Sequence, residues 1–496
     1  NVTTYTYDAY GTPQTIARTD GGTITNTWNA RGDLLVTKDA NGNPTTMTYN
    51  KRRLLTSVAD ALGNTVSNIY NAAGLKTAVM DPLGRETVTA WTPTYKVASI
   101  TFPDSGIVSN RYDSRDWLVE TVDPRGNVTS NSYDIAGRKI AVVDRLGNAT
   151  RFVLDANGNV IAQTNALGKA TTFAYDALNR LVKTTDPLSH SISNSFDVAG
   201  RLVAVTDEMG YTTQFERDAL GRTTAEIKPD GVTERYSLDP LGNLLAFQNG
   251  LGNVRTFAFD GMNRMTNETD AGGNSRSFVF DAAGNLLERH DADGAVIEYA
   301  YDELNRLTQI DYPDTTTVRY AYNDVGLRTY QSNAVAEVWY GFDAMDRLSV
   351  VTQSVGAVQS VVHYAFDPNG NRTNIVYPGG ASVGCAFDAA DRLTQVADWN
   401  IRVTTYTYDS LHRKTGVAYP SSATGTWNWD DASRLTRIQY HNGTSNFVDR
   451  VYSLDAHGNT TAMEINAGLL PTVSPMVKRL TQNAADELTA IQTKAN

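Results

Sequence analysis

The chain lacks several features that mark common protein classes. It has one cysteine, Cys385, so it cannot form an internal disulfide. No apolar stretch approaches the roughly 18 residues that a membrane-spanning helix needs. No long basic run is present, and the net charge is −11, so we do not expect nucleic acid as a partner.

Motifs that carry chemistry are also scarce. The six histidines lie singly, without the paired spacing of zinc ligands, and there is no phosphate-binding loop or nucleophile elbow. Asp39 and Asp155 each begin a segment like part of a calcium loop, but Pro44 and Val160 stand where that loop needs glycine. We therefore expect no metal, no cofactor and no catalytic residue.

What the chain has in abundance is a repeat. An aromatic residue followed by Asp or Asn recurs along it, and we call that Asp or Asn the anchor. From Asp8 to Asn323 the anchor recurs every 21 residues, fifteen times in succession. Later steps vary from 20 to 25 residues, and a degenerate copy begins at Asn483. Clear copies of the pair are Tyr112-Asp113, Tyr133-Asp134, Tyr175-Asp176, Phe196-Asp197, Phe259-Asp260 and Tyr301-Asp302. A fixed period of this length predicts a repeat array.

Each repeat begins with a turn signal, which we call the anchor turn. Its third residue after the anchor is mostly Gly, as at Gly137 and Gly200, or else Asn or Asp. These residues best tolerate a positive φ, so this position is predicted to be left-handed. The anchor side chain can accept hydrogen bonds from the turn's own amides. Four repeats have another residue in this position, and we expect altered turns there. They are Arg53, Tyr95, His412 and Ser433.

A second turn follows in each repeat, with a sequence such as Asp81-Pro-Leu-Gly84. Between the turns lie short segments rich in Thr, Val, Ile, Tyr and Phe, which have the length and composition of strands. The fold class is therefore all-β, with tandem hairpins forming one continuous antiparallel ribbon. The aromatics of the signature are predicted to stack as a ladder along it. Because open twisted sheets rarely exceed about ten strands, a ribbon of about 44 must coil. A propeller is the alternative, but it closes at roughly four to eight blades and eleven would be needed here.

The pattern resembles the RHS/YD repeat family. Copies close to its consensus are Tyr175-Asp-Ala-Leu-Asn-Arg-Leu181, Phe196-Asp-Val-Ala-Gly-Arg-Leu202 and Tyr301-Asp-Glu-Leu-Asn-Arg-Leu307. Members include bacterial polymorphic toxins, shell subunits of insecticidal toxin complexes, and teneurins. The resemblance implies a ribbon wound into a spiral shell, which in the toxins holds a C-terminal effector. The segment with which toxin shells cleave off that effector is not found here, so its aspartates are assigned to no residue.

The array is expected to fall into three parts: regular repeats over 1–342, less regular repeats over 343–460 and a degenerate terminal repeat over 461–496. The chain reads as a fragment of a longer one. Strands of about six residues give the ribbon an area on the order of 4,000 Å², enough for a sphere of about 18 Å radius. This segment is therefore expected to be part of a wall and too small for a complete container.

The leading hypothesis is a structural shell segment of a secreted or cell-surface bacterial protein. Its expected partners are an encapsulated C-terminal effector, a neighbouring shell segment or a second copy of itself. An adhesive filament or stalk is the alternative, with Trp427 and Trp429 as candidate glycan contacts. An enzyme is the third hypothesis, but a regular array offers no unique constellation of acids and bases.

Overall fold

The computed structural model describes residues 3–443, 445–466, 476–482 and 488–495, and their side chains as far as residue 466. Throughout these residues the secondary structure consists of strands and turns. The degenerate anchor at Asn483 lies outside the described residues. Where the chain is described, no helix is both long and apolar enough to cross a membrane.

The described residues form forty-six strands, which follow one another along the chain. The first twelve are β1 (Thr4–Tyr7), β2 (Pro13–Ala17), β3 (Thr23–Trp28), β4 (Leu34–Lys38), β5 (Pro44–Tyr49), β6 (Leu55–Ala59), β7 (Thr65–Tyr70), β8 (Lys76–Met80), β9 (Glu86–Trp91), β10 (Val97–Thr101), β11 (Ile107–Tyr112) and β12 (Leu118–Val122). The next twelve are β13 (Val128–Tyr133), β14 (Lys139–Val143), β15 (Ala149–Leu154), β16 (Val160–Thr164), β17 (Ala170–Tyr175), β18 (Leu181–Thr185), β19 (Ser191–Phe196), β20 (Leu202–Thr206), β21 (Thr212–Arg217), β22 (Thr223–Ile227), β23 (Thr233–Leu238) and β24 (Leu244–Gln248).

The second half repeats the same alternation. It begins with β25 (Val254–Phe259), β26 (Met265–Thr269), β27 (Ser275–Phe280), β28 (Leu286–His290), β29 (Val296–Tyr301), β30 (Leu307–Asp311), β31 (Thr317–Tyr322), β32 (Arg328–Ser332), β33 (Ala336–Phe342), β34 (Leu348–Val355) and β35 (Val358–Phe366). It ends with β36 (Arg372–Val376), β37 (Ser382–Phe387), β38 (Leu393–Ala397), β39 (Val403–Tyr408), β40 (Lys414–Ala418), β41 (Ala423–Trp429), β42 (Leu435–Asn442), β43 (Ser445–Leu454), β44 (Thr460–Ile465), β45 (Met476–Gln482) and β46 (Leu488–Ala495).

The strands form one antiparallel sheet, in which strands that follow one another along the chain pair, as β13 to β16 do. The predicted all-β ribbon of tandem hairpins is therefore confirmed. β13 illustrates the pairing. It bonds to β12 along its first half, at Val128 to Ser130, and to β14 along its second half, at Ser130 to Tyr133. The register shifts by one residue just before Tyr133, as in a hairpin whose turn ends in a left-handed residue.

The turn at Asp134 shows why the sequence bends there. Its carboxylate accepts hydrogen bonds from the amides of Ala136 and Arg138, both at 2.9 Å. The amide of Gly137 donates to the carbonyl of Asp134, and Gly137 has a φ of +81°. The second turn uses the same bonds, with Asp123 accepting from Arg125 and Asn127. One local motif, an Asx turn closed by a left-handed residue, thus makes both edges of the ribbon.

The prediction of altered turns at four repeats is wrong. Arg53, Tyr95, His412 and Ser433 have φ between +63° and +66°, and each donates its amide to the anchor carbonyl as glycine does. Three of these side chains also make a contact that glycine could not. Arg53 bonds to Asp33 at 2.6 Å, His412 lies 2.9 Å from Asp144, and the hydroxyl of Ser433 accepts from Arg413 at 3.1 Å. We infer that these contacts offset the cost of the left-handed backbone.

Irregular steps between anchors are absorbed by longer strands. β34 and β35 have eight and nine residues and are joined by a tight turn at Gly356. β42 and β43 have eight and ten residues. In the regular repeats strands have five or six residues. The proposed division of the array at residues 342 and 460 stays a prediction.

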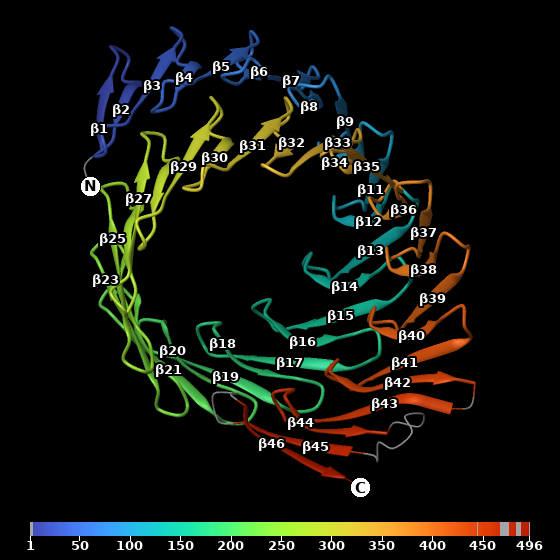
Figure 1. Cartoon of the computed structure of the whole chain (residues 1–496). Coiled ribbons are helices and arrows are strands. Elements are labelled where there is room, and N and C mark those ends of the chain that lie inside the picture. The colour runs from blue at the N-terminus through green and yellow to red at the C-terminus, as the bar shows by residue number, and fades with distance from the viewer. Residues whose placement is uncertain (1–2, 444, 467–475, 483–487, 496) are drawn as a thin grey trace. The chain divides into compact units, whose positions relative to one another are not determined.

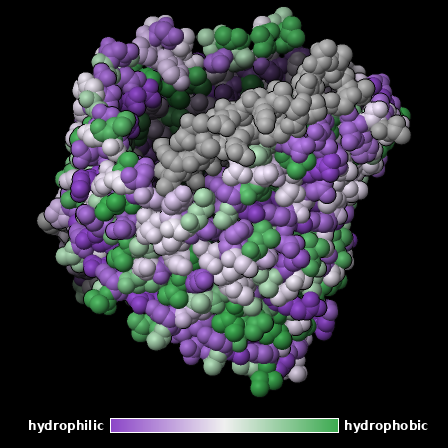
Figure 2. Space-filling view, turned by 90° about the horizontal axis from the view of Figure 1, so that it is seen from below, coloured by the Kyte–Doolittle hydropathy of each residue, from purple (hydrophilic) through white to green (hydrophobic). Residues whose placement is uncertain are grey.

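The ribbon is one sheet thick, so it has almost no core. Among the residues whose side chains are described, only four apolar ones are buried: Ala78, Ala225, Ile297 and Val417. Figure 2 shows one face, on which hydrophobic residues lie in small groups among hydrophilic ones. Stability must therefore come from contacts between neighbouring repeats.

The chain divides into two compact units, each made of two main stretches of ribbon. Unit 1 comprises residues 1–110, 237–370 and 376–380, and unit 2 comprises residues 111–236, 371–375 and 381–496. In each unit we call the earlier stretch the first pass and the later one the second pass. In unit 1, strands β1 to β8 (blue) and β27 to β32 (yellow) lie side by side (Figure 1). The ribbon therefore returns along itself after about twelve repeats, which is the predicted coiling.

Two glycine substitutions separate backbone strain from packing. Gly137 and Gly147 are both left-handed, but a Cβ at Gly137 would lie 2.7 Å from the Trp117 ring, whereas one at Gly147 would meet nothing within 4 Å. Replacing Gly147 by Ala should destabilise its turn by about 1–2 kcal/mol. Gly137→Ala should cost about 1–3 kcal/mol more, because Trp117 must move. Hydrogen exchange of the two hairpins measures both effects, and equal losses would contradict the packing argument.

Candidate functional site

In many repeats the residue four places after the anchor is an arginine that links the repeat to the next one. Arg392 donates its Nε to Asp388 Oδ2 at 2.7 Å, within its own turn. Its Nη1 donates to the carbonyl of the next anchor, Asp409, at 3.0 Å. Its guanidinium also lies 4.9 Å from the centre of the Tyr408 ring. One side chain therefore joins a carboxylate, a carbonyl and an aromatic ring from two consecutive repeats.

The same arrangement recurs along the chain. Arginines that bond both their own anchor carboxylate and the next anchor carbonyl are Arg138, Arg180, Arg201, Arg264, Arg306, Arg347, Arg413 and Arg434. Those that also cover the next signature aromatic are Arg180 on Phe196, Arg264 on Phe280, Arg306 on Tyr322, Arg347 on Phe366, Arg392 on Tyr408 and Arg413 on Trp429. The sequence predicted that the signature aromatics stack on one another. At these six repeats an arginine lies against the signature aromatic.

The polar tip of the signature aromatic has its own partner. Tyr133 donates its hydroxyl to the carbonyl of Leu118 at 2.9 Å, and Asn131 donates to the same carbonyl at 3.1 Å. That carbonyl lies beyond the end of the pairing between β12 and β13. The two side chains thus satisfy an acceptor that the splayed strands leave open. Trp429 does the same with its indole nitrogen, which donates to Lys414 O at 2.9 Å.

Hydrogen bonds hold several anchor carboxylates in their charged form. The backbone amide of Arg138 and, next among the favourable contacts, its guanidinium lower the pKa of Asp134. At Asp388 partial burial opposes ionisation, but the hydrogen bonds from Arg392 outweigh it and the pKa is lowered. The pKa is lowered in the same way at equivalent anchors, such as Asp176, Asp197, Asp260 and Asp409, so these shifts follow the repeated turn structure.

A seam joins the two passes within each unit: second turns of the first pass meet anchor turns of the second pass. In unit 1, Arg85 of a second turn donates to Asp346 of an anchor turn at 2.8 Å. Thr19 donates to the carbonyl of Gly261 at 2.7 Å.

The seam of unit 2 follows the same rule. Lys169 lies 2.7 Å from Asp431. Arg125 donates to the carbonyl of Asp388 at 2.9 Å. Opposite charges and backbone carbonyls thus hold one pass to the other, edge to edge.

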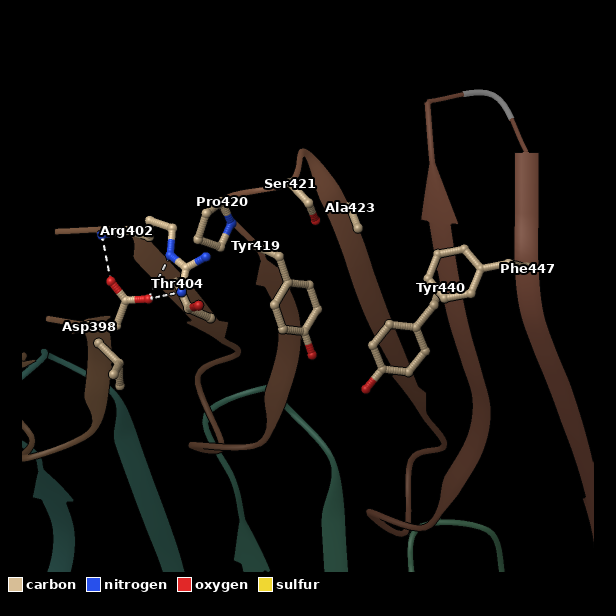
Figure 3. A pocket seen from close by; sticks show the side chains of 10 residues that line it. Asp398, Arg402, Thr404, Tyr419, Pro420, Ser421, Ala423, Tyr440 and Phe447 are labelled. Atoms are coloured by element: carbon tan, nitrogen blue, oxygen red, sulfur yellow. Dashed lines mark hydrogen bonds and ion pairs between the residues drawn. The ribbon is translucent and has the colours of Figure 1, made fainter. Parts of the chain in front are cut away.

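A groove opens in unit 2 between the second turns that follow β38 and β40 (Figure 3). Its volume is about 530 Å³. Asp398 and Arg402, bonded at 2.7 Å, form one end, and the rings of Tyr419, Tyr440 and Phe447 line the other. Tyr419 and Tyr440 stack with centroids 6.4 Å apart. Burial and the hydrogen bond with Tyr419 raise the pKa of Tyr440.

A family model for the RHS repeat matches the chain at seven places. They are residues 28–65, 112–149, 155–190, 196–233, 239–275, 280–317 and 387–424, together more than half of the chain. The chain belongs to the RHS repeat family. Among curated proteins none matches it.

Solved structures share the RHS ribbon fold. A crystal structure of TcdB2-TccC3-TEV is 13% identical and aligns with a TM-score of 0.52 over 98% of this chain and 34% of its own length. The Photorhabdus luminescens Tc holotoxin pore is 13% identical, with a TM-score of 0.51 over 99% of this chain and 33% of its own length. This chain therefore spans about one third of those structures. At this identity the likeness shows the fold alone.

The aromatics singled out as glycan contacts are engaged within the RHS ribbon. Trp429 occupies the signature position and has Arg413 over its ring. Trp427 has the Lys414 ammonium 3.8 Å from its ring centre and the edge of Tyr440 at 5.7 Å. Their proposed contact with glycans stays a prediction. The groove was missed because Tyr440 and Phe447 lie on the lengthened strands β42 and β43, outside the repeat's usual positions.

Replacing the linking arginine should loosen the junction between two repeats. Arg392→Lys keeps the charge but loses the planar fork that reaches both Asp388 and Asp409. We expect a loss of about 1–3 kcal/mol in the free energy of opening, measured by hydrogen exchange of β39. Arg402→Lys is the matched control, because Arg402 bonds its own turn carboxylate but its side chain is 60% exposed. A similar effect of both substitutions would contradict the linking role.

Acid should open the Asp-anchored turns before the Asn-anchored ones. The pKa of Asp134 is lowered in the folded chain, so its contribution to stability is present above the unfolded pKa of about 3.9 and is lost as pH falls through the lower folded value. Asn50 accepts the same two amide bonds and does not titrate. Hydrogen exchange corrected for intrinsic rates, followed from pH 6 downward, should show loss of protection at 134–138 first. Parallel loss at both turns would argue against it.

Proposed function

We propose that this chain is a wall segment of an RHS shell that encloses or presents another polypeptide, in a secreted or cell-surface bacterial protein. The observation that supports this most directly is the seam. A ribbon that bonds edge to edge with its own earlier pass makes a surface wider than one strand length, which is what a wall requires.

The chemistry along the ribbon supports a structural role in place of catalysis. Groups with shifted pKa values recur at equivalent turns, and a regular set of this kind offers no unique pair of acid and base. In the described part of the chain no three metal-binding side chains come together. The proposal therefore assigns the function to shape and surface, with a C-terminal polypeptide or a neighbouring shell segment as the partner.

Protection from protease tests the enclosing role. In the full-length gene product, the polypeptide that follows the repeats should resist an added protease until the shell is unfolded. The same polypeptide joined to residues 1–496 alone should be digested quickly, because a ribbon on the order of 4,000 Å² is too small to surround it. Equal digestion of both, or a gene product with nothing for the repeats to enclose, would overturn the proposal.

A further inference from the structure

The seam uses only one edge of each pass. Within each unit the second turns of the first pass face the anchor turns of the second pass. The anchor turns of the first pass and the second turns of the second pass therefore remain outside the seam. In unit 2 these two free edges are the anchor turns between residues 134 and 222 and the second turns between residues 398 and 423.

The free anchor turns of unit 2 expose large apolar side chains. The exposed fractions are 97% for Ile135, 70% for Leu178, 108% for Val198 and 74% for Leu220. On the second turns inside the seam of the same unit, apolar side chains are far less exposed: Leu146 38%, Leu167 42% and Met209 41%. The free edge thus presents apolar side chains of the kind that the seam covers.

The free second turns carry an apolar residue under strain. Ile401 is 83% exposed and has a φ of +61°, in the position that glycine usually fills. A β-branched side chain is rarely found in this conformation, and it disfavours the turn. Ile401 gains little packing within its own chain in return, and Trp399 of the same turn is 59% exposed. Strained backbone of this kind persists where surrounding contacts compensate for it, and it often marks a functional position.

An arginine on this free edge has the same position in its turn as an arginine inside the seam. Arg85 is the fifth residue of its second turn; it bonds Asp81 of that turn and also Asp346 of the other pass, and its side chain is 16% exposed. Arg402 holds the same place in its turn and bonds Asp398, but its side chain is 60% exposed. Arg85 uses its Nη1 to bond the other pass. The corresponding end of the Arg402 guanidinium faces solvent.

The groove beside Arg402 lies at a position that corresponds to a contact point of the seam in unit 1. It lies between two consecutive second turns, over the rings of Tyr419 and Tyr440 (Figure 3). In the seam of unit 1 an anchor turn enters beside a second turn, where the hydroxyl of Thr19 meets Gly261 and Met262. The groove is therefore open at a point where an apolar anchor turn would sit.

We propose that the second-turn edge at residues 398–423 docks the free anchor-turn edge at residues 134–222 of a second copy of this chain. Among the residues whose side chains are described, both halves of a seam are exposed, with apolar side chains on each and an arginine beside the groove. The contact joins two different surfaces, so it is heterologous and adds copies head to tail. Contacts of the kind that join the two passes within one chain would thus join two copies and lengthen the wall.

Sedimentation velocity on the 496-residue chain, from about 1 to 200 µM, tests the proposal. The weight-average sedimentation coefficient should rise with concentration. Ile401→Gly should weaken association about tenfold or more, because it removes one buried aliphatic side chain from the contact. The same variant should stabilise its turn, since the strain is relieved, so weaker association cannot be attributed to misfolding.

Ser422→Gly is the matched control. Ser422 is left-handed, with a φ of +65°, and exposed in the neighbouring second turn. This variant relieves the same strain without removing an apolar group, so its association should equal that of the parent chain. Val198→Asp on the opposite edge should weaken association, whereas Val153→Asp, at a 52% exposed site on the face of β15 and outside the turn, should not.

A chain that stays monomeric across the range overturns the proposal. Equal association of the Ile401→Gly and Ser422→Gly variants does so as well, because copies would then meet through another surface.

Discussion

The bond between an anchor carboxylate and the arginine four residues later is the interaction on which this structure depends. A ribbon one sheet thick cannot bury a core, and only four apolar side chains in the part with described side chains are buried. What a core does in a globular domain is done here by a chain of local links. Arg392 ties its own turn to the next one and lies against the next aromatic, and its neighbours along the ribbon do the same. Stability then becomes a sum of nearest-neighbour contacts.

The same links explain how the repeat tolerates variation. Where the anchor is Asn29, the fourth residue after it is Asp33, and Arg53 of the next repeat bonds that carboxylate. The signs of the charges have exchanged places, yet one repeat is still joined to the next. At Arg217 a guanidinium replaces the signature aromatic and donates to the carbonyl of Leu202, which is the bond that Tyr133 makes to Leu118. The geometry of the junction is retained although its residues differ.

Much of this could be predicted from the sequence because the determinants are local. The period, the two turns and the left-handed positions follow from residues within five places of each other, as Asp134 and Gly137 show. The partner of the aromatic could not be foreseen in the same way. Arg392 and Tyr408 lie sixteen residues apart, and only the register of the strands between them brings the guanidinium over the ring. The exceptions at Arg53 and His412 were misjudged for a related reason, since their partners lie in other repeats.

The seam could not be predicted from the sequence, because it joins turns that lie more than 200 residues apart. It follows from the way in which a ribbon can be widened. Inner strands such as β14 and β15 already have two hydrogen-bonded neighbours, so the ribbon cannot widen by adding strands. It can widen only through its turns, which form its two long edges. Turn side chains with donors that the local motif does not use, such as Nη1 of Arg85 and Nζ of Lys169, are therefore available to contact another pass. This also gives a reason for the varied residues within an otherwise repetitive turn. The anchor and the left-handed residue close the turn, while the side chains between and beside them determine what the edge can meet.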